Sequence, residues 1–298
     1  MNNMCIKQES GQGPLQSKPV RSTTVLSLVF VGLLLVGAPY ATAQQSPQAK
    51  PVDTLQSARS LVANQAALIT EFDVNGLKVL VKRREGSLTI GAGLYIKGGA
   101  RNITTQNAGI ESFALDVATE ASASFPRAKM RDEVARMGTV IGASANHDYS
   151  VVALRSTRPN FDRSWQIFTD VALRPSFTKE DVSLVQQRIV VSLSDDTDNP
   201  DVYLQKLQEK VAYAGHPYVN NTSGTPETVA KLTPEDLRQY HTKLMETSRL
   251  LLVIVGDLNP NEVRTLVTAS FGKLPRGAYK TEAVPQLAFD KSSVEITP

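Results

Sequence analysis

The chain has 298 residues, with 32 Lys and Arg, 29 Asp and Glu, and a single cysteine. This length accommodates one large domain or two smaller ones. The nearly even balance of charge argues against a nucleic-acid-binding protein, because such proteins carry a concentrated basic surface.

The N-terminus has the pattern of a secretory signal peptide over residues 1–43. Three basic residues precede a short apolar run at 25–38, and an A-x-A cleavage site ends at Ala43. The run is shorter than the roughly 20 residues that span a membrane. We therefore expect cleavage after Ala43 and export, with the bacterial periplasm as the destination. The alternative is an uncleaved anchor, and only then would the chain contact a membrane.

Removal of the leader leaves 29 basic and 28 acidic residues and no cysteine, because Cys5 lies in the leader. The exported part therefore has neither disulfides nor cysteine ligands for a metal. Residues 44–67 are polar and contain Pro47 and Pro51, which predicts a flexible leader ahead of the folded domain.

The folded part is expected to begin with strands. Two apolar runs, Leu68–Val74 and Leu77–Lys82, flank Asn75-Gly76. Asn and Gly tolerate positive φ, so this pair predicts a β-hairpin. A longer strand, Leu88–Lys97, follows and ends at Gly98.

The middle and the end of the chain are expected to be mainly helical, with three further strands. Apolar residues recur at helical spacing from Ile110 to Ala121, which predicts an amphipathic helix. The other predicted helices cover 128–137, most of 160–244 with breaks near 175, 200 and 215–225, and a last helix that ends at Phe271. The other predicted strands are 139–145, 149–156 and 250–256.

This order of elements predicts an α+β domain over residues 68–275. It would be a two-layer sandwich in which helices cover one face of a mainly antiparallel sheet. Residues 276–298 are expected to be a linker into a second domain that is missing from this chain.

Several short fragments in this stretch match a known family in order and spacing. Each is common alone, but together they resemble the N-terminal domain of the M16 (insulinase/pitrilysin-like, processing-peptidase-like) zinc metallopeptidases over about residues 70–275. The resemblance implies the two-layer fold of LuxS-like and M16 metallopeptidases. The fragments are Val74–Val79, Gly93–Arg101, Ala108-Gly109, Gly215–Tyr218, Gly224-Thr225, Lys231–Leu237 and Val253–Asp257.

The resemblance also locates the zinc motif of the family, H-x-x-E-H, on the helix that begins near Ile110. Its two histidines bind zinc from one helix face, and its glutamate is the general base on the bound water. Here the ligand positions are Ser112 and Asp116, and the base position is Leu115. The third ligand, a downstream glutamate in the family, aligns with Ser192. All four roles are replaced, so we expect a pseudoenzyme without a cofactor.

A substituted metal site is the competing interpretation of this helix. Glu111, Asp116 and Glu120 could supply carboxylates, with His147 from a strand turn. We favour the simpler interpretation, in which Glu111 and Glu120 are solvated charges on the helix face and His147 is a turn residue.

The resemblance implies a function as the inactive partner of an active M16 zinc peptidase subunit, with which the chain would form a heterodimer. An extended peptide or protein substrate would add as a strand to an exposed sheet edge. We place that edge at Ile90, Leu94, Ile96 and Gly98, beside the helix of Ser112.

Two alternatives remain from the sequence. The chain could be an active zinc-dependent metalloendopeptidase with atypical ligands, and it would then bind Zn²⁺. It could also be a purely structural scaffold, as are the core subunits of respiratory complexes that resemble this family.

Overall fold

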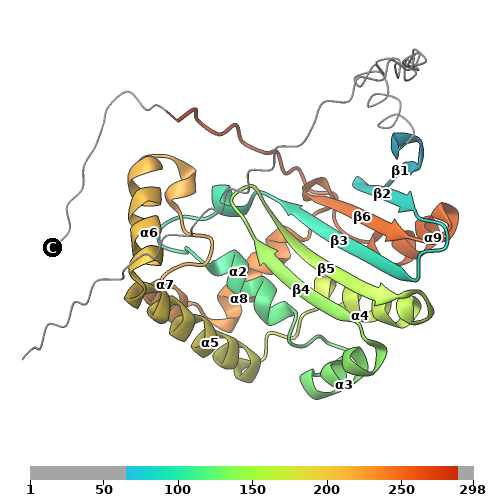
Figure 1. Ribbon diagram of the computed structural model, residues 1–298, viewed down its shortest axis with the longest axis horizontal. Coiled ribbons are helices and arrows are strands. Elements are labelled where there is room, and N and C mark those ends of the chain that lie inside the picture. The colour runs from blue at the N-terminus through green and yellow to red at the C-terminus, as the bar shows by residue number, and fades with distance from the viewer. Residues whose placement is uncertain (1–64, 288–298) are drawn as a thin grey trace, which may run out of the picture. The chain divides into compact units, whose positions relative to one another are not determined.

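One mixed sheet of six strands organises the domain (Figure 1). The computed structural model describes residues 65–287, so the predicted signal peptide and nearly all of the flexible leader lie outside the described residues. The strand order is β1-β2-β6-β3-β5-β4, and only β2 and β6 run parallel. The strands are β1 (Ile69–Val74), β2 (Leu77–Arg83), β3 (Thr89–Lys97), β4 (Val140–Ala145), β5 (Tyr149–Thr157) and β6 (Leu250–Gly256).

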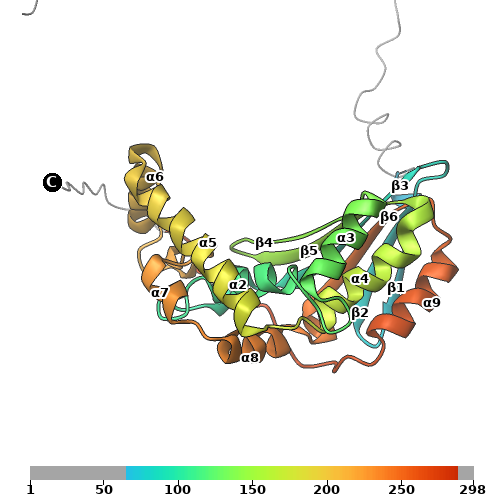
Figure 2. The same ribbon diagram turned by 90° about the horizontal axis from the view of Figure 1, so that it is seen from below.

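The helices gather on one face of this sheet (Figure 2). Side chains of β6 show why: Leu252 and Ile254 point into the helical layer and are fully buried, whereas Val253 and Val255 between them stay partly exposed. The predicted α+β two-layer fold is therefore confirmed. The α-helices are α2 (Ile110–Ala118), α3 (Arg127–Met137), α4 (Phe161–Leu173), α5 (Lys179–Asp198), α6 (Pro200–Ala212), α7 (Pro226–Lys231), α8 (Pro234–Leu244) and α9 (Pro260–Phe271). Short 3₁₀ turns are η1 (Gly99–Asn102), η2 (Arg158–Asn160), η3 (Pro217–Val219) and η4 (Thr247–Arg249).

Local sequence chemistry sets the turns and the helix ends as expected. Asn75 and Gly76 both have positive φ, at 52° and 90°, and close the β1–β2 hairpin. Gly138 has φ 61° and ends α3. Thr233 accepts a hydrogen bond from the Asp236 N–H, and the Asp236 side chain accepts one from the Thr233 N–H, so a capping box starts α8.

The predicted peptide-binding edge at Ile90, Leu94, Ile96 and Gly98 is wrong. Strand β3 lies inside the sheet, where it pairs with β5 on one side and with β6 on the other. The three apolar side chains are fully buried in the core. Gly98 follows the strand at φ 127°, and its N–H donates to the Asp148 carbonyl at 2.8 Å. The edge strands are β1 and β4.

Helix α2 lies between two hydrophobic cores. The larger core fills the space between the sheet and α4 and α9, and it includes Trp165 and Leu115. The smaller one joins α2 to α5 and α8 through Phe113 and Val117. Because α2 is buried on both sides, only a narrow stripe of its surface remains accessible. Within residues 65–287, no helix is long and apolar enough to cross a membrane.

The position of β3 generates a stability prediction. Leu94→Ala should lower the free energy of unfolding by about 2–5 kcal/mol, because it removes a fully buried side chain and leaves a cavity. Val140→Ala on edge strand β4, where the side chain is 49% exposed, is the control and should change it by no more than about 0.5 kcal/mol. Urea unfolding measures both. A Leu94 variant as stable as its control would contradict the central position of β3.

Candidate functional site

Two glycines bring the start of α2 against a distant loop. Gly109 precedes α2 at φ 88°, and a Cβ there would lie 2.8 Å from the Ser223 carbonyl oxygen. Gly224 has φ 80°, and a Cβ there would lie 2.6 Å from the Ala108 carbonyl oxygen. The two backbones touch, which only residues without a Cβ allow. This contact places Ser223 beside the exposed stripe of α2.

A cavity of about 270 Å³ lies between α2 and α5. The structure brings together Ser112, Asp116 and Ser192, the three positions that the family resemblance aligns with zinc ligands. Ser192 is 76 residues from Asp116 in the sequence. The lining residues are Ser112, Asp116, Arg188, Ile189, Ser192, Leu193 and Ser223.

Leu115, which the family resemblance aligns with the general base, does not line this cavity. Its side chain is 1% exposed and belongs to the core beneath the sheet. A leucine has no group that accepts a proton, so at this position the side chain serves packing alone.

Asp116 is the one carboxylate in the cavity wall. Its side chain makes no hydrogen bond or ion pair with the residues that the structure describes. Burial raises the pKa of this carboxyl to about 6, the positive charge of Arg188 opposes that rise, and the negative charge of Glu120 adds to it. An unpartnered carboxylate with a raised pKa marks a candidate functional position.

Arg188 belongs to an ion cluster centred on Glu120. Its Nη1 donates to Glu120 Oε1 at 2.9 Å, and Arg131 Nη2 donates to Oε2 at 3.0 Å. Arg127 lies 3.7 Å from the same carboxylate and also pairs with Asp181. Glu120 is buried at 8% exposure, so its interpretation as a solvated helix-face charge is wrong. The cluster joins α3 and α5 to the end of α2.

Glu111 was also expected to be solvated, and this too is wrong. Its side chain is 2% exposed. The Ser150 hydroxyl donates to Oε1 at 2.5 Å, and the Tyr240 hydroxyl donates to Oε2 at 2.6 Å. Burial, and then the negative charge of Glu111, raise the pKa of Tyr240, so this hydroxyl remains a donor. Glu111 thus fixes α2 between β5 and α8.

The histidines are occupied elsewhere. His241 Nε2 bonds the Ala172 carbonyl at 2.9 Å, and burial lowers the pKa of this imidazole to about 4. His216 Nδ1 accepts from the Tyr218 N–H at 3.1 Å. The ring of His147 lies 4.8 Å from that of Tyr218, between centroids. None of the three lines the cavity beside α2.

The donor set in the cavity does not fit catalytic zinc. Such a site needs three protein ligands, from His, Glu, Asp or Cys. The cavity offers one carboxylate and three hydroxyls, and a guanidinium lines the same wall. Nowhere in residues 65–287 do three His, Cys, Asp or Glu side chains gather in a way that could hold a metal ion.

Asp116 should make the free energy of unfolding fall as pH rises, whereas an ion-paired carboxylate makes it rise. Because the folded-state pKa of about 6 lies above the ordinary aspartate pKa of 3.8, folding favours the protonated form. The stability gained at low pH is therefore lost as pH rises towards 6. Asp116→Asn should gain about 2–3 kcal/mol in unfolding free energy over wild type between pH 4 and pH 8. Denaturant unfolding at each pH measures this, and exposed Asp132→Asn is the control. A difference that does not grow with pH would contradict the burial of Asp116.

Comparison with known proteins agrees with the geometry. The chain matches the family described as Insulinase (Peptidase family M16) over residues 78–226, and the Peptidase M16 inactive domain over 231–297. It is similar to cytochrome b-c1 complex subunit 1 of Bos taurus, with 24% identity over 79% of this chain and 48% of that protein. Mitochondrial-processing peptidase subunit beta of Caenorhabditis elegans is 22% identical, over 71% of this chain and 46% of that protein.

Two further relatives extend the comparison. The non-peptidase homolog YmxG of Helicobacter pylori is 22% identical, over 72% of this chain and 51% of its own length. The periplasmic protease PqqL of Escherichia coli shares the fold, with a TM-score of 0.68 and 18% identity over 76% of this chain and 26% of that one. The chain spans about half the length of the curated relatives it matches. It belongs to the M16 (insulinase) peptidase family.

Proposed function

We propose that this chain is a catalytically inactive M16 protein, exported to the periplasm, that helps an active M16 peptidase subunit to hold an extended peptide. The observation that carries the proposal is the composition of the cavity beside α2. Ser112, Asp116 and Ser192 meet there as the ligand positions require, yet they do not form a zinc donor set.

The loss of the general base supports the same conclusion independently. Leu115 is packed into the core, and a replacement base would have to sit on the cavity wall. The only titratable acceptor there is Asp116, which occupies a ligand position. One of the similar proteins is itself named a non-peptidase homolog. We therefore propose that the chain binds no catalytic zinc and cleaves no peptide alone.

Strand β4 is the edge that we now propose for peptide binding. It pairs with β5 alone, so one side of its backbone is open to another strand. Val140 is 49% exposed, and no atom lies within 4 Å of the position that a Cβ on Gly142 would take. Helix α2 packs against β4 and also against α5 (Figure 1). A peptide along this edge would therefore run beside the helix that carries Ser112 and Asp116.

Two of the similar proteins support a role within an assembly. They are named as subunits, one of the cytochrome b-c1 complex and one of the mitochondrial-processing peptidase. We propose the corresponding arrangement here, in which the catalytic groups come from a separate M16 subunit with an intact H-x-x-E-H motif.

Metal analysis and reconstitution test the proposal that this chain is inactive and assists an active M16 subunit. The purified chain should contain no stoichiometric zinc and should not cleave peptides in a fluorogenic peptide assay. With an active M16 peptidase of the same cell, it should form a complex and raise peptide cleavage several-fold. Stoichiometric zinc with chelator-sensitive cleavage by the chain alone would instead establish an atypical endopeptidase. Absence of both a complex and a gain in cleavage would reject the partner role.

The peptide edge is tested by hydrogen exchange in the reconstituted complex. The active subunit is used as a variant in which its catalytic glutamate is replaced by glutamine, so that the peptide stays intact. Adding a peptide that the wild-type subunit cleaves should slow hydrogen exchange of the β4 amides at least several-fold. Exchange slows because pairing with an added strand protects these amides. Edge strand β1 is the internal control and should not change. Protection at β1, or at neither edge, would contradict the assignment to β4.

A further inference from the structure

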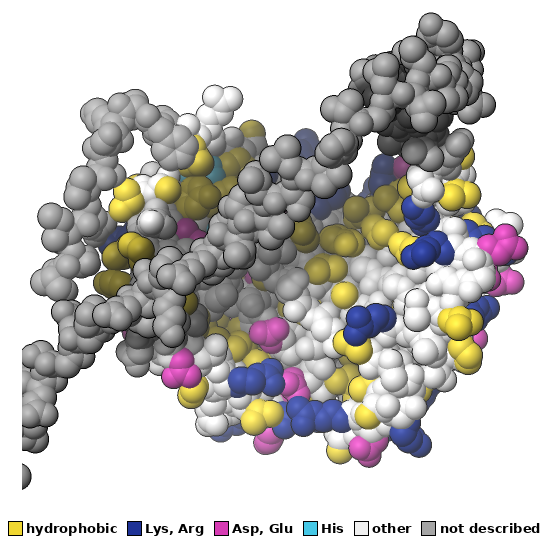
Figure 3. Space-filling view, in the orientation of Figure 1, with side chains coloured by type: hydrophobic (Ala, Val, Ile, Leu, Met, Phe, Trp, Pro, Cys, Tyr) yellow, Lys and Arg dark blue, Asp and Glu magenta, His cyan; other side chains and the backbone are white. Residues whose placement is uncertain are grey.

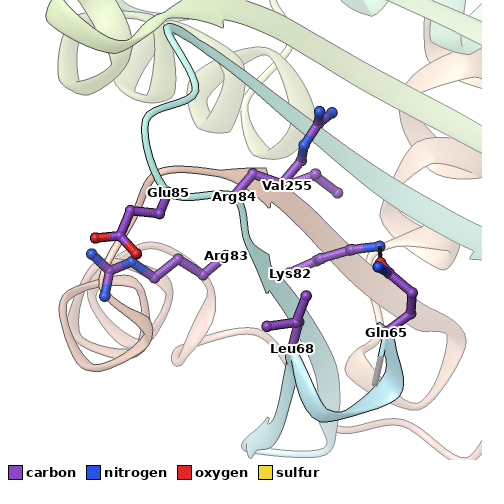
Figure 4. A pocket seen from close by; sticks show the side chains of 7 residues that line it. All are labelled: Gln65, Leu68, Lys82, Arg83, Arg84, Glu85 and Val255. Atoms are coloured by element: carbon purple, nitrogen blue, oxygen red, sulfur yellow. Dashed lines mark hydrogen bonds between the residues drawn. The ribbon is translucent and has the colours of Figure 1, made fainter. Parts of the chain in front are cut away.

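The end of the sheet where β2 leads into β3 carries a second, larger hollow of about 810 Å³ (Figure 4). It opens on the face of the sheet opposite the helices, where Lys82 and Val255 line it. Nothing in the proposed peptidase-partner role uses this end of the domain. The lining residues are Gln65, Leu68, Lys82, Arg83, Arg84, Glu85 and Val255.

Three cations at this end form no ion pair within the described residues, and Glu85 is the one acid that lines the larger hollow. Lys82 Nζ donates to the neutral side chain of Gln65 at 2.7 Å. Arg84 and Arg155 line an adjoining hollow of about 230 Å³, and neither forms an ion pair within the described part of the chain. Arg83 differs, because its Nε lies 3.3 Å from Asp257. The uncompensated positive charge is therefore concentrated on Lys82, Arg84 and Arg155.

Large aliphatic side chains stand beside these cations. Leu88, in the loop between β2 and β3, is 80% exposed, and Leu68 and Ile69 at the start of β1 are 50% and 44% exposed. The space-filling view shows basic and hydrophobic side chains interspersed over this end, with a few acidic ones among them (Figure 3). Exposed aliphatic residues next to unpaired cations are typical of surfaces that insert shallowly into an anionic lipid interface.

The course of the chain points in the same direction. Gln65, the first described residue, is in the wall of the larger hollow. The apolar run at 25–38 therefore precedes this end by only 26 residues. An uncleaved anchor, the alternative interpretation of this run, would hold this end within reach of the membrane.

We propose that the six residues Leu68, Ile69, Lys82, Arg84, Leu88 and Arg155, the basic end, form a docking surface for an anionic phospholipid bilayer. The aliphatic side chains enter the interface, and the cations contact lipid phosphates. An acidic protein would not require Leu88 at 80% exposure. Single-stranded nucleic acid would call for aromatic stacking groups, and none of the six is aromatic.

The test is co-sedimentation with lipid vesicles of the protein in the form that the cell exports. Binding to phosphatidylcholine vesicles that contain phosphatidylglycerol should exceed binding to pure phosphatidylcholine, and it should weaken as salt rises. Removing Lys82, Arg84 and Arg155 as Gln variants should cost roughly fivefold in affinity per charge. Leu88→Ser should cost roughly tenfold through lost burial.

The matched control replaces three exposed lysines elsewhere, Lys231, Lys243 and Lys273, by Gln. This variant has the same net charge as the triple variant of the basic end and should keep wild-type binding. Circular dichroism melts confirm that both variants are folded. Equal loss in both triple variants, equal binding to the two kinds of vesicle, or binding to poly-glutamate without binding to vesicles would each overturn the proposal.

Discussion

The burial of α2 on both sides is the constraint on which the rest of the structure depends. One side contributes Leu115 to the core beneath the sheet, and the other contributes Phe113 and Val117 to the core shared with α5 and α8. Buried Glu111 also fixes the orientation of the helix, since its two oxygens accept hydrogen bonds from β5 and from α8. With both cores and these bonds in place, the helix can neither rotate nor slide. Only the stripe of Ser112 and Asp116 remains open, and it faces α5.

The same constraint explains how the cavity keeps its walls without a metal donor set among its lining residues. Zinc in a catalytic site is a local charge of +2 held by a few side chains. Beside α2, the described residues supply positive charge through arginines of α3 and α5, which converge on Glu120. These cations are arginine side chains of the protein itself, and by pairing with Glu120 they join the helices α3 and α5 to the end of α2. The cavity keeps its place because the two cores hold its walls.

The sequence predicted the helices and strands better than it predicted which of them lie side by side. The hairpin at Asn75-Gly76 and the helix that ends before Gly138 follow from local backbone chemistry, and both were found. The capping box that starts α8 at Thr233 was not predicted. The edge assigned to β3 failed because strand order is not local: β6 begins at Leu250 and inserts between β2 and β3. Glu111 and Glu120 were misplaced because hydrophobic periodicity treats every carboxylate as solvent-facing. Their partners, Tyr240 and Arg188, lie far along the chain. Ser192 was expected near Asp116 because the family resemblance implies a ligand position there, and both residues line the cavity between α2 and α5. Arg188, one helical turn earlier, was missed because the resemblance assigns it no role.

The late position of β6 in the chain also has a consequence for biogenesis. Until residues 250–256 are made, the sheet can form only as two separate pieces, the β1–β2 hairpin and the three strands β3, β5 and β4. Each piece then exposes a strand edge that β6 will later cover. The parallel contact between β2 and β6 spans more than half the chain, and such long-range pairings form slowly. The domain therefore completes its sheet only after almost all of it has been delivered.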